Sequence, residues 1–168
     1  MTVSANIILG ADGSTSLGAS SGGLTDSADR IRFHDIRSKS DAILIGGNTA
    51  RNEPYGKTPV PLVIISKQNQ FPDLVRANPM ANIWNLSPKQ ALTKAIVDFG
   101  PNILIEAGPT LLLEFIREGC VEELFITISP KTGGVNKVEM KEITSGFVEV
   151  SREEVSGTKF LKYLKKSI

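Results

Sequence analysis

The stretch from Asn102 to Leu113, Asn-Ile-Leu-Ile-Glu-Ala-Gly-Pro-Thr-Leu-Leu-Leu, predicts a buried strand that passes directly into a helix. Its apolar part, Ile103–Ile105, is short and rich in β-branched residues, which is typical of a buried strand. Pro109 suits the first turn of a helix, where a missing N–H costs little. The helix start therefore offers unpaired N–H groups to a phosphate, and Gly108 lets an anion approach the backbone closely. An ordinary strand-to-helix turn is the alternative.

Two further strands are predicted to end in residues that suit a phosphorylated ligand. The apolar run Asp41–Gly46 continues into Gly47-Asn48-Thr49, and the run Pro61–Ile65 continues into Ser66-Lys67-Gln68. In open α/β sheets ligands bind at the carboxyl ends of the strands. The standard dinucleotide fingerprint and the P-loop are both absent from the sequence. The residues alone thus predict a nucleotide- or phosphate-binding α/β domain.

A basic stripe marks the first predicted helix, which begins at the cap residues Thr25-Asp26-Ser27 and runs to about residue 40. Arg30, His34 and Arg37 fall at i, i+4 and i+7 and therefore share one face. The stripe is interpreted as a solvated face, or else as an anion contact or a subunit interface. Before this helix, the Ser- and Gly-rich segment Ser14–Gly23 is predicted to be a flexible loop over a site.

The order of the elements predicts an α/β fold with a mostly parallel central sheet and an antiparallel C-terminal hairpin. Ser87-Pro88-Lys89-Gln90 is a clear helix start. Residues 69–81 are expected to be irregular, and the lysines of the last strand are expected to protect a sheet edge. The remaining predicted strands are Val3–Leu9, Asn82–Asn85, Val121–Ser129, Gly146–Val155 and Thr158–Lys165.

Length and composition suit a single domain over residues 1–168, with 40% hydrophobic residues to form a core. The net charge of +1 gives no indication of nucleic acid or an anionic membrane as partner. The apolar runs are too short to cross a bilayer, and the N-terminus lacks the basic start of a secretory signal. The single cysteine excludes an internal disulfide framework, and one cysteine with one histidine makes no conventional zinc site. We therefore expect a cytoplasmic, metal-independent protein.

Five short motifs occur in order along nearly the whole chain. They are Asp12-Gly13, Arg30…His34…Arg37…Asp41-Ala42, Gly46…Thr49…Pro54, Glu106-Ala107-Gly108-Pro109-Thr110-Leu111, and Gly119…Val121…Glu123-Leu124…Pro130…Gly133-Gly134. Together they resemble the C-terminal reductase domain of the bifunctional deaminase–reductases of riboflavin biosynthesis, which has the three-layer dihydrofolate reductase-like fold. Each motif is weak alone, whereas their order and spacing are fairly specific. The deaminase domain has no counterpart in this chain.

The resemblance implies an NADPH-dependent reductase that transfers a hydride to C1 of the ribosylamino group of a phosphorylated pyrimidine, and it leans toward a homodimer. The Ala107–Gly108 peptide bond is expected to be cis, like the Gly-Gly bond of relatives. Ser66 and Lys67 are expected near the adenosine ribose, where a cation favours a 2′-phosphate. The other expected cofactor contacts are Gly46, Gly47, Thr49, Ala107, Gly108, Pro109, Thr110 and Leu111.

Glu106 and Asp12 are the catalytic candidates. Glu106 would orient the substrate and stabilise a developing iminium charge, and Asp12 would face it across the site. The alternative is a structural Glu106 that accepts backbone N–H groups or pairs with a cation such as Arg51, because an unpaired buried charge is costly.

Departures from the family pattern concentrate on the substrate side. Asn6 stands where the family often has lysine, and Asn52-Glu53 replaces an acidic pair. The family's Leu-Thr-x-Arg segment has no clear match, and Lys57 is the only cation in that region. Two alternatives therefore stay open: a related enzyme acting on another pterin or pyrimidine, and a non-catalytic nucleotide-binding protein. The expected substrate contacts are Gly13, Asn52, Glu53 and Lys57.

Overall fold

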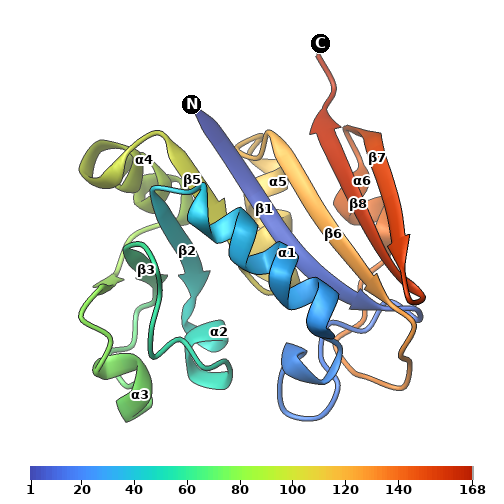
Figure 1. Cartoon of the computed structure of the whole chain (residues 1–168). Helices are drawn as coiled ribbons and strands as arrows, with labels where there is room; N and C mark the ends of the chain where they lie inside the picture. The colour runs from blue at the N-terminus through green and yellow to red at the C-terminus, as the bar shows by residue number, and fades with distance from the viewer. Residues whose placement is uncertain (168) are drawn as a thin grey trace.

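The computed structural model describes residues 1–167 and places eight strands in one sheet (Figure 1). The strands are β1 (Thr2–Gly10), β2 (Ala42–Gly46), β3 (Leu62–Ile65), β4 (Ala81–Trp84), β5 (Asn102–Ile105), β6 (Glu123–Ser129), β7 (Phe147–Val155) and β8 (Thr158–Lys165). They lie in the order β4-β3-β2-β5-β1-β6-β8-β7. The first six run parallel, and β8 runs antiparallel to both β6 and β7. The predicted α/β fold with an antiparallel C-terminal pair is confirmed.

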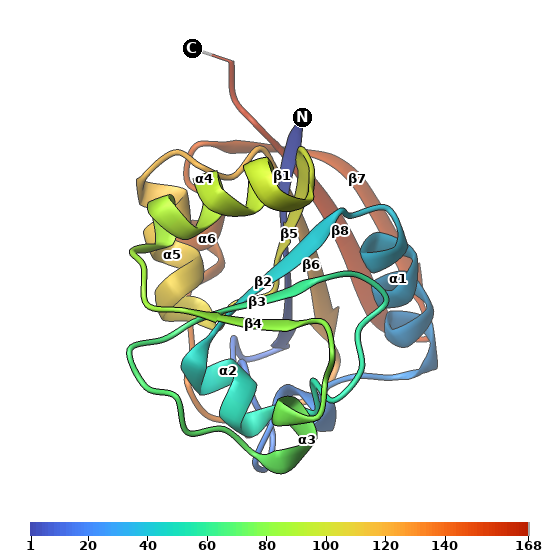
Figure 2. The ribbon, with the colours of Figure 1, turned by 90° about the vertical axis from the view of Figure 1, so that its left-hand side faces the viewer.

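Helices cover both faces of the sheet. They are α1 (Ser27–Ser38), α2 (Gly47–Asn52), α3 (Asp73–Arg76), α4 (Pro88–Phe99), α5 (Pro109–Arg117) and α6 (Met140–Thr144), with a 3-10 turn at Ser21–Gly23. Figure 2 shows α1 on one face of the sheet and α4 and α5 on the other. None of the helices within residues 1–167 is long and apolar enough to cross a membrane.

The central strands are continuous apolar runs because both of their faces are covered. In β2, the side chains of Ile43 and Ile45 belong to the same core cluster as Ile36 of α1. Leu44, between them, points to the opposite cluster, which contains Phe115 of α5. The period-2 alternation of a strand thus divides one apolar run between two cores.

The first turn of α1 is fixed by Asp26, one of the three residues that the sequence offered as a cap. Its carboxylate accepts a hydrogen bond from the backbone N–H of Asp29 at 2.8 Å and one from the hydroxyl of Thr158 in β8. The Thr158 hydrogen bond, followed by the one from Asp29, lowers the pKa of Asp26 below its ordinary value. One side chain therefore caps the helix and ties it to the sheet.

We expect Asp26→Ala to lower the free energy of unfolding at neutral pH by about 1–2 kcal/mol, the usual cost of losing a helix cap. Because the pKa of Asp26 is lower in the folded state, the contribution of its charge is present above about pH 4 and is lost as the pH falls below that. Urea unfolding of both proteins at neutral and acidic pH measures the difference. A difference that stays constant into acid would show that the cap acts without its charge.

Two features of the fold differ from the sequence prediction. The short helices α3 and α6 were not predicted, because 4 and 5 residues are too few to display a helical period. The lysine-rich β8 is not an edge strand, since it lies between β6 and β7. Its Lys162 instead forms an ion pair with Glu123 of β6 at 3.0 Å. The exposed edge at this end of the sheet is β7.

The Ala107–Gly108 peptide bond is trans, so the prediction of a cis bond is wrong; no peptide bond within residues 1–167 is cis. Gly108 precedes Pro109 and has an extended backbone, with φ −61° and ψ 166°. An extended residue is what a following proline favours, and the chain reaches it through a trans bond. A cis bond between non-proline residues would cost about 3–4 kcal/mol, with no compensation visible in this turn.

Candidate active site

A cleft opens where β1 and β5 separate. The two strands pair only from Thr2 with Asn102 to Ala5 with Ile105. Beyond that point β1 continues to Gly10, while the chain after β5 turns into α5. A cavity of about 890 Å³ lies at this divergence, between β1, α1, α2 and the start of α5. Its position at the carboxyl ends of parallel strands is where α/β sheets bind ligands.

The three strand ends singled out in the sequence meet at this cavity. The segment Ala107–Leu111 lines it at the end of β5, and Ser66 lines it at the end of β3. Gly46, Gly47 and Thr49 line it at the end of β2. No side chain of the described residues caps α5, so the N–H groups of its first turn and the positive end of its dipole remain available to an anion.

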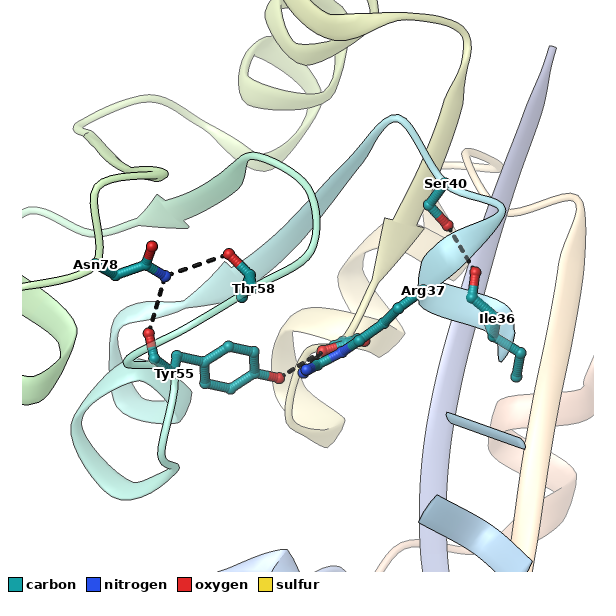
Figure 3. Close-up of polar contacts among 7 residues, drawn as sticks. Ile36, Arg37, Ser40, Tyr55, Thr58 and Asn78 are labelled. Atoms are coloured by element: carbon teal, nitrogen blue, oxygen red, sulfur yellow. Dashed lines mark hydrogen bonds and ion pairs between the residues drawn. The ribbon is translucent and has the colours of Figure 1, made fainter. Parts of the chain in front are cut away.

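The carboxylate of Glu106, also on the cavity wall, is held by two side chains. Arg37 donates from Nε and Nη2 to its two oxygens, each at 2.7 Å, and the Tyr55 hydroxyl donates to Oε2 at 2.6 Å. Figure 3 shows Arg37 reaching this point from α1 and Tyr55 from the loop after α2. The side chains of Arg37 and Glu106 are only 11% and 4% exposed. The cation that pairs with Glu106 is therefore Arg37, and the suggestion of Arg51 is wrong.

Arg37 and Tyr55 have pKa values that follow from this arrangement. Burial lowers the pKa of Arg37, but the hydrogen bond and charge of Glu106 outweigh burial and raise it overall. Burial, and then the charge of Glu106, raise the pKa of Tyr55 well above its ordinary value. Arg37 thus stays cationic and Tyr55 keeps its proton across the pH range in which enzymes work. The site combines a neutralised carboxylate with a permanent hydroxyl donor.

Aromatic and amide side chains support this group. The guanidinium of Arg37 lies 4.0 Å from the centroid of the Phe33 ring, which stacks under it. The buried amide of Asn78 donates to the carbonyl oxygen of Tyr55 at 3.0 Å and to the hydroxyl of Thr58 at 3.2 Å (Figure 3). The hydrogen bonds of Asn78 therefore hold the loop that carries Tyr55 in place.

Two of the predicted substrate contacts, Asn52 and Glu53, line the cavity. Glu53 accepts the backbone N–H of Ser21 at 2.7 Å, so it also holds the 3-10 turn of the serine-rich loop against the end of α2. The loop predicted to lie over a site contributes Thr15, Ser16 and residues 19–22 to the cavity wall. Its placement over the cavity agrees with the sequence interpretation.

The other predicted site residues lie outside the cavity wall. Asp12 accepts hydrogen bonds from the Ser14 hydroxyl at 2.7 Å and the Gly133 N–H at 3.1 Å, and it pairs with Lys137 at 2.9 Å. These contacts, led by that from Ser14, hold the pKa of Asp12 well below its ordinary value. Asp12 therefore joins two loops, and its catalytic role stays a prediction. The same holds for the roles of Gly13, Lys57 and Lys67, none of which borders the cavity.

The basic stripe of α1 faces the cavity. Arg30, His34 and Arg37 all contribute to its wall, and Arg30 and His34 are also exposed to solvent, so the anion contact stays a prediction. Sequence reasoning missed Tyr55 and Phe33, and no local pattern marks either of them. Within residues 1–167 there is no group of three or more His, Cys, Asp or Glu side chains that could hold a metal ion.

Comparison with known proteins finds a matching family model and solved structures of the same fold. Residues 1–145 match the model of the RibD C-terminal domain family. A pyrimidine reductase-like protein from Corynebacterium diphtheriae superposes with a TM-score of 0.76 at 19% identity, over 99% of this chain and 92% of that one. Acinetobacter baumannii RibD gives 0.74 at 18% identity, over 99% of this chain and 58% of that one. No curated protein sequence matches the chain.

A Thermotoga maritima diaminohydroxyphosphoribosylaminopyrimidine deaminase/5-amino-6-(5-phosphoribosylamino)uracil reductase has the same fold, with a TM-score of 0.71 at 17% identity. The match covers 98% of this chain and 56% of that one. This chain therefore spans little more than half of the Acinetobacter and Thermotoga proteins. At such low identities these likenesses establish the fold.

Proposed function

The chain belongs to the RibD C-terminal domain family, and from that premise we propose that it reduces the ribosylamino group of a phosphorylated pyrimidine with NADPH. The observation that carries the proposal is one cavity that joins three phosphate-suited strand ends to the Arg37–Glu106–Tyr55 group. Two proteins of the same fold are a pyrimidine reductase-like protein and a 5-amino-6-(5-phosphoribosylamino)uracil reductase, which supports the substrate class.

The donors on the cavity wall fit a phosphorylated dinucleotide. The first turn of α5 has no side-chain cap, and a Cβ built on Gly108 would have only the Thr49 hydroxyl within 4 Å, at 3.9 Å. Backbone N–H groups and a hydroxyl thus face the same open space, which is the donor set that phosphates use at helix starts. When bound, NADPH supplies the hydride. The residues that would hold it are Gly46, Gly47, Thr49, Ser66 and the segment Ala107–Leu111.

On the substrate side, Glu106 would orient the group that is reduced. Opening of the sugar gives an iminium cation at C1, which accepts the hydride, and a fixed carboxylate stabilises that cation without reorganising. Because Arg37 neutralises Glu106, the substrate's cationic centre competes with the guanidinium for the same carboxylate. Arg30 offers positive charge, and His34 a ring N–H, to the substrate phosphate, in place of the missing Leu-Thr-x-Arg segment.

The proposal is tested by incubating the purified protein with 5-amino-6-(5-phosphoribosylamino)uracil and NADPH deuterated at its transferable position. We expect NADPH oxidation and a ribitylamino product that carries deuterium at C1, detected by mass spectrometry. Parallel incubations replace this substrate with the dephosphorylated pyrimidine or with a dihydropterin. Turnover of only one of those compounds would favour the alternative substrate. NADPH binding without turnover of any compound would favour a non-catalytic protein, and absence of binding would contradict the proposal.

A further inference from the structure

Arg51 of α2 has a guanidinium that the protein itself leaves incompletely satisfied. Its Nη2 donates to Oδ1 of Asn48 at 2.8 Å, and its guanidinium lies 5.5 Å from the centroid of the Phe71 ring. Its Nη1 is buried without a hydrogen-bond partner, and within residues 1–167 no other buried side-chain nitrogen or oxygen is in that state. A buried donor without an acceptor is costly, so such groups call for a functional explanation.

The positive charge of Arg51 is also uncompensated. None of the ion pairs formed within residues 1–167 includes Arg51, whereas Arg37, Arg76 and Arg152 each pair with a carboxylate. Arg51 nevertheless lines the cavity. A cation fixed on a cavity wall by an aromatic ring and an amide, with no counterion from the protein, is arranged to receive an anion from outside.

The surroundings of Gly47 locate this cation in the cavity. A Cβ built on Gly47 would lie 2.7 Å from the Ser66 hydroxyl and 3.2 Å from Nη2 of Arg51. Arg51 and Ser66 therefore both border Gly47, which follows β2, and both line the cavity. In the sheet, β2 separates β3 from β5, so this point is displaced across the strands from Glu106, which follows β5. A dinucleotide whose pyrophosphate bound at the start of α5 and whose adenosine extended toward β3 would bring its ribose 2′-phosphate to Arg51.

We propose that Arg51 binds the 2′-phosphate of the adenosine ribose and so determines the preference of this protein for NADPH over NADH. The inference rests on the proposed function, and it assigns to Arg51 the role that the sequence suggested for Lys67. Lys67 is exposed and does not border the cavity, whereas Arg51 is already held there. The planar guanidinium presents paired donors to a phosphate. The Ser66 hydroxyl lines the same cavity but donates to the carbonyl oxygen of Gln68 at 2.9 Å.

The test measures binding by titration calorimetry, without substrate, for NADPH, NADH, 2′,5′-ADP and 5′-AMP. Wild-type protein should bind NADPH and 2′,5′-ADP more tightly than NADH and 5′-AMP. Arg51→Gln should lose about 10- to 100-fold in affinity for the two 2′-phosphate ligands and little for the other two. Arg51→Lys keeps the positive charge but loses the paired donors of the guanidinium. Its affinities for the two 2′-phosphate ligands should therefore lie between those of the wild type and those of Arg51→Gln. Arg76→Gln, which removes an arginine outside the cavity, is the matched control and should behave as wild type.

The outcomes separate this inference from the proposed function. Equal losses for NADPH and NADH in Arg51→Gln, or a preference that disappears in Lys67→Gln instead, would overturn the role of Arg51. A wild type that reduces its substrate and prefers NADPH, with the preference unchanged in Arg51→Gln, would overturn the inference alone. A selective loss of 2′,5′-ADP binding in a protein that reduces no pyrimidine would support the inference and contradict the proposed function.

Discussion

An Arg37→Met variant is expected to unfold with a free energy about 3–5 kcal/mol below that of the wild type, the usual loss when one member of a buried ion pair is removed. The side chain of Glu106 is only 4% exposed, so the variant leaves a buried carboxylate with the Tyr55 hydroxyl as its remaining side-chain partner. The stacking of the guanidinium on Phe33 is lost as well. Methionine preserves most of the length of the side chain, so the effect reports the charge more than the volume. Urea unfolding measures it.

The matched control is the double variant Arg37→Met/Glu106→Leu, which removes both charges. Because burying two charges costs nearly as much as their attraction returns, the double variant should recover much of the stability lost in Arg37→Met. A loss below about 1 kcal/mol in Arg37→Met would show that water reaches Glu106 and that the pair behaves like a surface salt bridge.

The strand ends could be predicted because each is encoded within a few consecutive residues. In β5, an apolar run, a carboxylate, small residues and Pro109 together specify a strand, a turn and a helix start. The same holds for the end of β2 at Gly46 and Gly47. Since parallel strands share one edge at their carboxyl ends, the meeting of these segments followed from the fold. Local chemistry and topology thus sufficed for this wall of the cavity.

The partners of Glu106 could not be predicted in this way. Arg37 and Tyr55 lie 69 and 51 residues away along the chain, and a single sequence does not specify which cation a buried carboxylate will face. Arg51 was the wrong choice, since its Nη2 donates to Asn48, and the cation that pairs with Glu106 is Arg37 of α1. The basic stripe of α1 could have indicated Arg37 as the partner. A row of basic side chains that faces a cavity places a cation near any carboxylate on the cavity wall.

In the turn after β1, the sequence did not reveal that Asp12 has structural partners. The motif Asp12-Gly13 placed Asp12 near the site by resemblance, whereas its carboxylate binds the N–H of Gly133, 121 residues further along. Gly13 has a φ of +81°, and a Cβ there would approach the carbonyl oxygen of Val138 to 2.7 Å. Asp12 and Gly13 thus have a structural role in packing two loops together. The sequence alone does not distinguish that role from a catalytic one.

Glu106→Gln is expected to slow hydride transfer by about 100-fold or more, while the affinity for NADPH changes little. A 100-fold decrease corresponds to about 2.7 kcal/mol of transition-state stabilisation. Two unit charges 4 Å apart near a protein surface interact with about 4 kcal/mol, so one carboxylate beside an iminium carbon can supply the effect. The variant also leaves the cation of Arg37 uncompensated beside the reacting centre, which disfavours the cationic iminium that accepts the hydride.

Single-turnover rates with deuterated NADPH, NADPH titrations and melting temperatures of each variant separate catalysis from structure. Tyr55→Phe is the matched control, because it removes one hydrogen bond to Glu106 and keeps the ring and both charges. It should slow the reaction by about tenfold or less, since one hydrogen bond to a charged group contributes about 1.5–3 kcal/mol and only part of that is specific to the transition state. Glu106→Gln/Arg37→Met restores the charge balance, so it should regain stability without regaining the rate. A Glu106→Gln variant that reduces substrate at the native rate, or a double variant that recovers rate and stability together, would make Glu106 a structural partner of Arg37.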